Sequence, residues 1–145
     1  MNQEIALKGK TYKVIGVDHY NLTNVLGKEQ TWDSYTVVDK NNNKTWISYG
    51  VAGKYFTQWA VLSEAVFKKA VVNAPFDCVL TGIANITFEG NPGYSTPFAE
   101  MVWFRPKERT YDFLLIERFL KQDGKTLIPQ ESYFQTGTIL KDFKL

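Results

Sequence analysis

The chain contains one cysteine, Cys78, and one histidine, His19, among its 145 residues. A single thiol excludes an intramolecular disulfide and a cysteine-based zinc site, and we expect Cys78 to be a small buried side chain. His19 follows Asp18, but neighbouring residues of a strand point to opposite faces, so we expect a half-exposed histidine that Asp18 does not orient. No phosphate-binding glycine loop, His-x-x-His pair or EF-hand spacing is present, so we predict no metal and no cofactor.

Long apolar runs and a strong net charge are also missing. No stretch approaches the roughly 18 apolar residues that a membrane-spanning helix needs. The first residues lack a charged leader followed by an apolar run. The 17 basic and 15 acidic residues give a net charge of +2, which is too small to attract nucleic acid or a membrane surface. We therefore expect a cytoplasmic protein without membrane insertion and without a nucleic-acid partner.

The chain is rich in aromatic and β-branched side chains, which suit the pleated surface of a strand. Residues 21–30 are polar and predict a loop. Residues 60–74 are ambiguous between a short helix, a strand leading into the second half and an irregular linker. We expect an all-β, mainly antiparallel protein with at most one short helix. Strands are predicted at 5–7, 11–20, 31–39, 44–49, 54–62, 78–89, 98–105, 110–122, 125–134 and 138–145.

Three local signals refine this prediction. The connection at residues 40–43 contains three asparagines, which tolerate left-handed backbone better than most residues. Asp123 and Gly124 predict a two-residue type I′ turn, in which both residues have positive φ. Gly82, inside a predicted strand, indicates a bulge or the close approach of another backbone.

The two halves of the chain resemble one β unit written twice, about 66 residues apart. Gly16 and Gly82 occupy matching positions in apolar runs, and Trp32 matches Phe98 (82 − 16 = 98 − 32 = 66). A unit of this size buries its apolar face poorly alone, so two copies are expected to share one core.

This pattern predicts the architecture. We expect residues 1–145 to form a single domain from two tandem β-meander repeats, at about 1–72 and 73–145. Two such meanders form either a two-sheet sandwich or a partly open barrel, and alternation alone does not separate them.

Carboxylates are the best supplied catalytic groups. Glu117 lies in the run 113–120, which is apolar except for Glu117 and Arg118, and a buried charge is costly there unless it is paired. We therefore expect Glu117 to face solvent or to pair with a nearby Lys or Arg. A hydrolase using Glu100, Glu117 or Glu131 would need two carboxyl groups in one cleft.

The aromatic side chains are more numerous than a small core strictly needs. The repeat places Trp32 and Trp103 at core positions. Tyr55 and Trp59, near the junction of the two halves, and Tyr94 are our candidates for exposed aromatics that contact a partner or ligand.

Four segments resemble a bacterial family known as domain of unknown function 4178. Residues 9–16 are similar to its strand "G-x-x-Y-x-V-x-G", residues 32–37 to "W-x-E-x-x-L", and residues 44–48 to "G-x-x-x-W-L-S". Residues 111–117 resemble a late strand of the family that ends in glutamate. The chain departs from the family at Asn43, which replaces the glycine before Trp46.

The resemblance implies a bacterial protein whose genes lie beside envelope-stress or membrane-associated genes, and therefore a protein partner. It implies no catalytic residue, because the family has no established activity. We predict a non-catalytic protein-interaction or assembly module of the bacterial cytoplasm. It is expected to bind a protein partner or to self-associate through an uncovered strand edge. If the partner is envelope-related, the protein would associate with the envelope peripherally. One alternative is a barrel that binds a sugar, lipid or nucleotide, and another is a carboxylate-dependent hydrolase. The candidate binding residues are Tyr55, Trp59, Tyr94 and Glu117.

Overall fold

Strands dominate the computed structural model, which describes residues 2–24, 26–50, 55–72, 76–90, 96–106, 112–141 and 143. The prediction of an all-β chain with one short helix is confirmed, and the ambiguous segment contains that helix. The elements are β1 (Glu4–Leu7), β2 (Lys10–Thr23), β3 (Glu29–Val38), β4 (Lys44–Tyr49), β5 (Phe56–Leu62), α1 (Glu64–Val72), β6 (Phe76–Gly90), β7 (Phe98–Pro106), β8 (Phe113–Leu120) and β9 (Leu127–Leu140).

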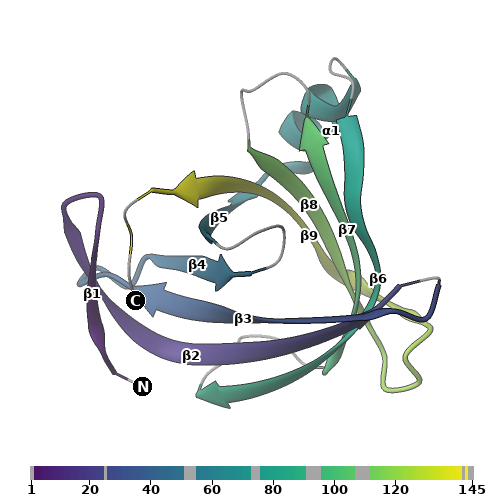
Figure 1. The fold of residues 1–145 in the computed structure, drawn as a ribbon, viewed down its shortest axis with the longest axis horizontal. Helices are drawn as coiled ribbons and strands as arrows, with labels where there is room; N and C mark the ends of the chain where they lie inside the picture. Colours follow the sequence, from purple (N-terminus) through teal and green to yellow (C-terminus); the bar gives the residue numbers. More distant parts are fainter. Residues whose placement is uncertain are drawn as a thin grey trace.

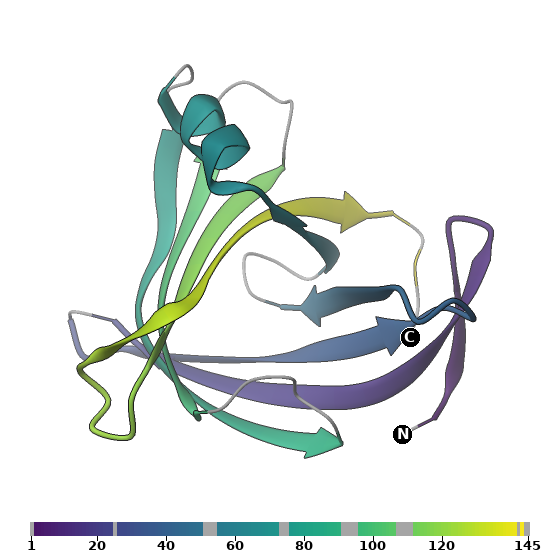
Figure 2. The ribbon, with the colours of Figure 1, turned by 180° about the vertical axis from the view of Figure 1, so that it is seen from behind.

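The strands form a closed antiparallel barrel of eight strands (Figures 1 and 2). One meander runs from β2 to β5 and a second from β6 to β9, and the pairs β2–β6 and β5–β9 join them. β1 pairs with the start of β2, outside this ring. Of the two predicted architectures the barrel is correct and the sandwich is wrong, although the ring is closed rather than partly open. The sequence repeat stays a prediction.

Two glycines allow β2 and β6 to approach closely where the barrel closes. A Cβ atom on Gly82 would collide with the carbonyl oxygen of Thr23, which confirms the predicted close approach of a second backbone. A Cβ atom on Gly90 would collide with the carbonyl oxygen of Ile15, and Gly90 also has a φ of +82°. The register of β2 against β3 shifts beside Ile15, so a bulge accompanies this contact.

Replacement of Gly90 by alanine is expected to destabilise the barrel through this contact. Gly27 is a matched control, because its φ of +78° is nearly the same but nothing lies within 4 Å of an added Cβ. Both variants carry the cost of left-handed backbone, and Gly90→Ala should lose about 1–3 kcal/mol more, since it is also overpacked. Urea denaturation measures both free energies of unfolding, and equal losses would contradict the steric explanation.

The helix α1 covers part of the outer wall of the barrel. It begins after Ser63, whose Oγ accepts a hydrogen bond from the backbone N–H of Val66 at 3.3 Å. Phe67 is buried, and its ring lies 5.0 Å from Phe134 on β9 and 6.5 Å from Phe104 on β7. The strand neighbours of these two rings, Gln135 and Trp103, face the interior, so the helix packs on the outside.

The two predicted turns have different outcomes. Asn42 has a φ of +62°, as the asparagine-rich connection predicts. The Asp39 carboxylate accepts hydrogen bonds from the backbone N–H groups of Asn41 and Asn43, on either side of Asn42. The type I′ prediction is wrong, because only Gly124 has positive φ. Instead, the Asp123 carboxylate accepts hydrogen bonds from the backbone N–H groups of Lys125 and Thr126, and the loop runs from Lys121 to Thr126.

Some predicted boundaries are also wrong. β2 extends to Thr23, because its last residues pair with both β3 and β6 and their outward side chains are polar. The separate strand predicted at 138–145 does not form over the described residues, since β9 continues to Leu140. The side chain of Cys78 lies outside the described part of the chain, so its burial stays a prediction.

Candidate functional site

The barrel encloses a cavity of about 160 Å³. Its lining comes from strands β2, β3, β4, β5, β7, β8 and β9, each of which turns alternate side chains toward the interior. Lys44 and Val61 are the exposed members of this lining, and they mark the side where the cavity meets solvent. The closed sheet therefore provides an interior space that meets solvent beside these two side chains.

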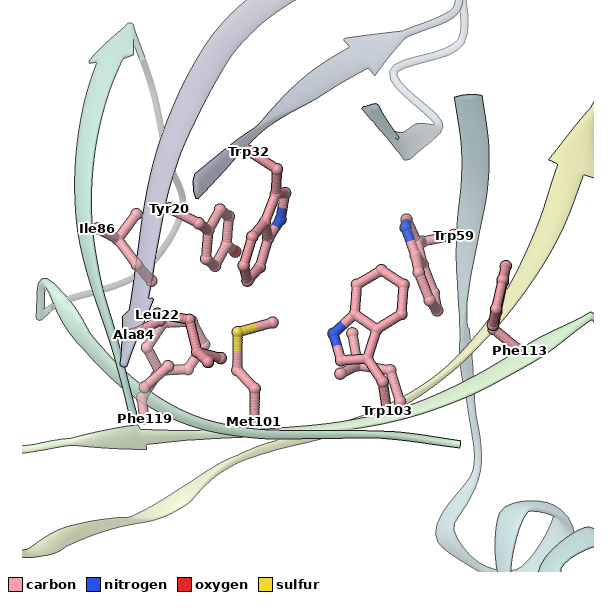
Figure 3. Packing of buried hydrophobic residues seen from close by; sticks show 12 residues of the cluster. Tyr20, Leu22, Trp32, Trp59, Ala84, Ile86, Met101, Trp103, Phe113 and Phe119 are labelled. Carbon is pink, nitrogen blue, oxygen red and sulfur yellow. The ribbon is translucent and has the colours of Figure 1, made fainter. Parts of the chain in front are cut away.

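Aromatic rings form much of the wall (Figure 3). The rings of Tyr20 and Trp32 are stacked, with centroids 4.9 Å apart and planes 6° from parallel. Trp103 stands at 79° to Trp32 and at 78° to Trp59, with centroids 6.2 and 4.4 Å away. The indole N–H of Trp59 donates to Ser48 Oγ at 2.8 Å, which fixes its orientation. The wall thus presents ring faces and edges roughly at right angles to one another.

A buried carboxyl group lies in this cavity. Glu117 is 7% exposed, accepts a hydrogen bond from the Tyr20 hydroxyl at 3.0 Å, and accepts a longer one from Gln135 Nε2 at 3.4 Å. Burial raises the pKa of Glu117 from 4.5 to about 7, and the charge of Asp18 adds to this, whereas the two hydrogen bonds lower it. The group therefore changes its protonation near neutral pH.

Asp18 is a second carboxyl group in the same cavity. It is 2% exposed and alternates along β2 with the outward-facing His19. Sequence reasoning considered Asp18 only as the neighbour of His19 and missed it as a site residue. The available signal was its spacing, because Asp18 has the same parity as the buried residues Val14, Tyr20 and Leu22.

Two further buried polar atoms belong to residues of the lining. Thr36 Oγ1 and Trp103 Nε1 have no hydrogen-bond partner among the described residues. A buried donor or acceptor without a hydrogen-bond partner costs free energy, so each atom is available to form a hydrogen bond with a molecule that enters the cavity.

The predicted site residues separate into two groups. Trp59 and Glu117 both line the cavity, whereas Tyr55 is half-buried with its ring 6.3 Å from Phe113. Trp59 is 3% exposed, so the expectation that it is an exposed aromatic is wrong. The expectation that Glu117 faces solvent or pairs with a cation is also wrong, because neutral donors satisfy it inside the barrel. Tyr94 lies outside the described residues.

His19 and Glu100 lie on the outer wall of the barrel. His19 Nδ1 is 2.6 Å from Asp33 Oδ1, a hydrogen bond that raises the pKa of His19, and Nε2 is 3.6 Å from Glu89. The side chain of His19 is 44% exposed, which confirms a half-exposed histidine that Asp18 does not orient. Glu100 lies 3.8 Å from Arg118, and both are exposed. Over the described residues, no three His, Cys, Asp or Glu side chains form a group that fits a metal ion.

Comparisons with known proteins leave the site to be interpreted from its own residues. No protein-family model, curated protein or solved structure matches this chain. The resemblance to domain of unknown function 4178 therefore stays a prediction. In the described part of the chain, no helix has both the length and the apolar character that crossing a membrane requires.

Proposed function

We propose that this protein is a barrel that binds a small organic molecule in its interior. The observation that supports this most directly is the cavity of about 160 Å³, in which aromatic faces surround a few polar groups. Ligand sites in proteins have this combination of apolar walls and a small number of placed polar atoms. An apolar cavity of about 150 Å³ holds one benzene molecule, so the ligand is a compact molecule rather than a lipid or nucleotide.

The protein-interaction hypothesis has less support from the geometry. Trp59, one of its proposed contact residues, is buried among other aromatic side chains. The pairs β2–β6 and β5–β9 also occupy strand edges that an open sheet would offer to a partner. A protein partner or self-association remains a prediction without a defined surface.

Hydrolysis is favoured by one observation, the presence of Asp18 and Glu117 in the same cavity with the pKa of Glu117 near 7. Of the predicted carboxylates, Glu100 is on the outer wall and does not contribute to such a pair. A cavity of this size leaves little room for the two groups on either side of a scissile bond, so binding is the function that we propose.

A cavity-filling substitution tests the proposal. Ser34 is buried in the lining, and Ser34→Leu should occupy part of the cavity and weaken binding of small fragments by about tenfold or more. Thr31→Leu is the control, because Thr31 is exposed on the same strand. Ligand-observed NMR would compare both variants with the wild type, using cationic, neutral and anionic fragments of comparable size. If no fragment binds the wild type, or if Ser34→Leu leaves binding unchanged, the proposal is wrong.

A further inference from the structure

The buried charged side chains among the described lining residues of the cavity are both acidic. Asp18 and Glu117 are both buried in its wall, whereas Lys44 is the basic side chain among the described lining residues and is exposed at the mouth. Solvent screens an exposed ammonium far more than the interior screens a buried carboxylate, so Lys44 does not neutralise the interior. A buried carboxylate is costly unless a positive charge approaches it.

The aromatic wall suits the same kind of group. Trp32, Trp59 and Trp103 all line the cavity, and the first two stand nearly perpendicular to Trp103, so the wall contains indole rings in different orientations. Such an arrangement matches a compact cation, because the faces of indole rings attract positive charge.

We propose, on the basis of the binding function above, that the ligand is a small organic ammonium cation, held against the carboxyl groups of Asp18 and Glu117 and the surrounding indole rings. The Tyr20 hydroxyl, which donates to Glu117 Oε2, positions that carboxyl group. The buried Thr36 hydroxyl and Trp103 N–H are available to an oxygen atom on the same ligand. The chemical class is therefore an amine or quaternary ammonium compound that also carries a hydroxyl or ether oxygen.

The affinity should rise with pH, because Glu117 gains its charge near neutral pH. The ionisable groups of the described lining are Asp18 and Tyr20 on β2, Lys44 on β4, Glu117 on β8 and Tyr133 on β9. Glu117 has a pKa of about 7, so its ionisation is the change that we expect to raise the affinity over this pH range.

Choline and its uncharged isostere 3,3-dimethylbutan-1-ol form a probe pair of nearly equal shape. Isothermal titration calorimetry near pH 8 should show choline binding about tenfold or more tightly than the alcohol, and this preference should shrink near pH 5.5. Equal or tighter binding of the alcohol near pH 8 overturns the cation proposal while leaving the binding function intact. If neither probe binds and the fragment panel also fails, both proposals are overturned.

Charge-removing variants give the matched test. Glu117→Gln should weaken choline binding by about tenfold near pH 8 and change the affinity for the alcohol by less than about threefold. Asp18→Asn is the second variant, should Glu117→Gln fail to fold, and the same selective loss is expected. Glu100→Gln, which removes an exposed charge on the outer wall, is the control and should leave both affinities unchanged. An equal loss for both probes in the charge-removing variants would contradict the proposal.

Discussion

Replacement of Glu117 by glutamine is expected to stabilise the folded protein near pH 8 and to have little effect near pH 5. In the unfolded chain this carboxyl group loses its proton near pH 4.5, whereas burial holds its pKa at about 7 in the barrel. The folded state therefore binds the proton more tightly, and stability falls as the pH rises from about 4.5 to about 7. The difference between these pKa values (7 − 4.5 = 2.5) corresponds to about 3 kcal/mol, a cost that glutamine does not carry.

Urea denaturation from about pH 5 to about pH 8 measures this effect as a free energy of unfolding. Glu117→Gln should be about 2–3 kcal/mol more stable than the wild type near pH 8 and within about 1 kcal/mol of it near pH 5. Glu100→Gln is the exposed control and should differ by less than about 1 kcal/mol throughout, because its contact with Arg118 is on the surface. A Glu117→Gln variant that is less stable near pH 8 would show that the folded state stabilises the charge.

This cost connects stability with the proposed ligand. A molecule that binds only the folded barrel stabilises it by mass action. A cation placed against Glu117 also favours the ionised form and so offsets the burial of that charge. Glu117 thus weakens the barrel when no ligand is bound, and it is also a residue that we expect the ligand to contact. Functional sites often contain residues that stability alone would not favour.

Much of the secondary structure can be predicted from the sequence, whereas the closure of the sheet into a barrel cannot. Alternation along β2 identifies which side chains share a face, because the strand has a period of two. It does not identify which strand lies beside β2. The closing pair joins residues 16–23 of β2 to residues 83–90 of β6, and no local turn connects these segments. A sandwich and a barrel therefore remained equivalent until the pairing was known.

The site was partly predictable for the same reason. Glu117 stands out as a charge in an apolar run, but its two hydrogen-bond donors, Tyr20 and Gln135, come from β2 and β9. We expected a charged partner or solvent because the residues near Glu117 in the sequence do not indicate which side chains lie beside it inside a barrel. Trp59 was expected to be exposed for a similar reason, since its position near the junction of the two halves does not indicate that β5 pairs with β9.

Replacement of Trp59 by alanine is expected to destabilise the barrel by about 3–5 kcal/mol, the cost of removing a large buried aromatic side chain. The variant loses the ring contacts with Trp103 and the hydrogen bond to Ser48, and it leaves a larger cavity. Val61→Ala on the same strand is the control, because Val61 is 55% exposed and should lose less than about 1 kcal/mol. Chemical denaturation measures both, and similar losses would contradict a central role for Trp59 in the core.

The contact between Trp59 and Gly137 gives this prediction a sharper form. The two residues are paired across β5 and β9, and a Cβ atom on Gly137 would lie 2.8 Å from the indole ring. Gly137→Ala should therefore cost about 1–3 kcal/mol in the wild type, where the ring must shift. In the Trp59→Ala background the indole is gone and only the Thr57 methyl group, 2.9 Å from the added Cβ, still opposes the substitution, so Gly137→Ala should cost less there than in the wild type. A double-mutant cycle measures this coupling, and additive losses would show that the indole does not determine the need for glycine at this position.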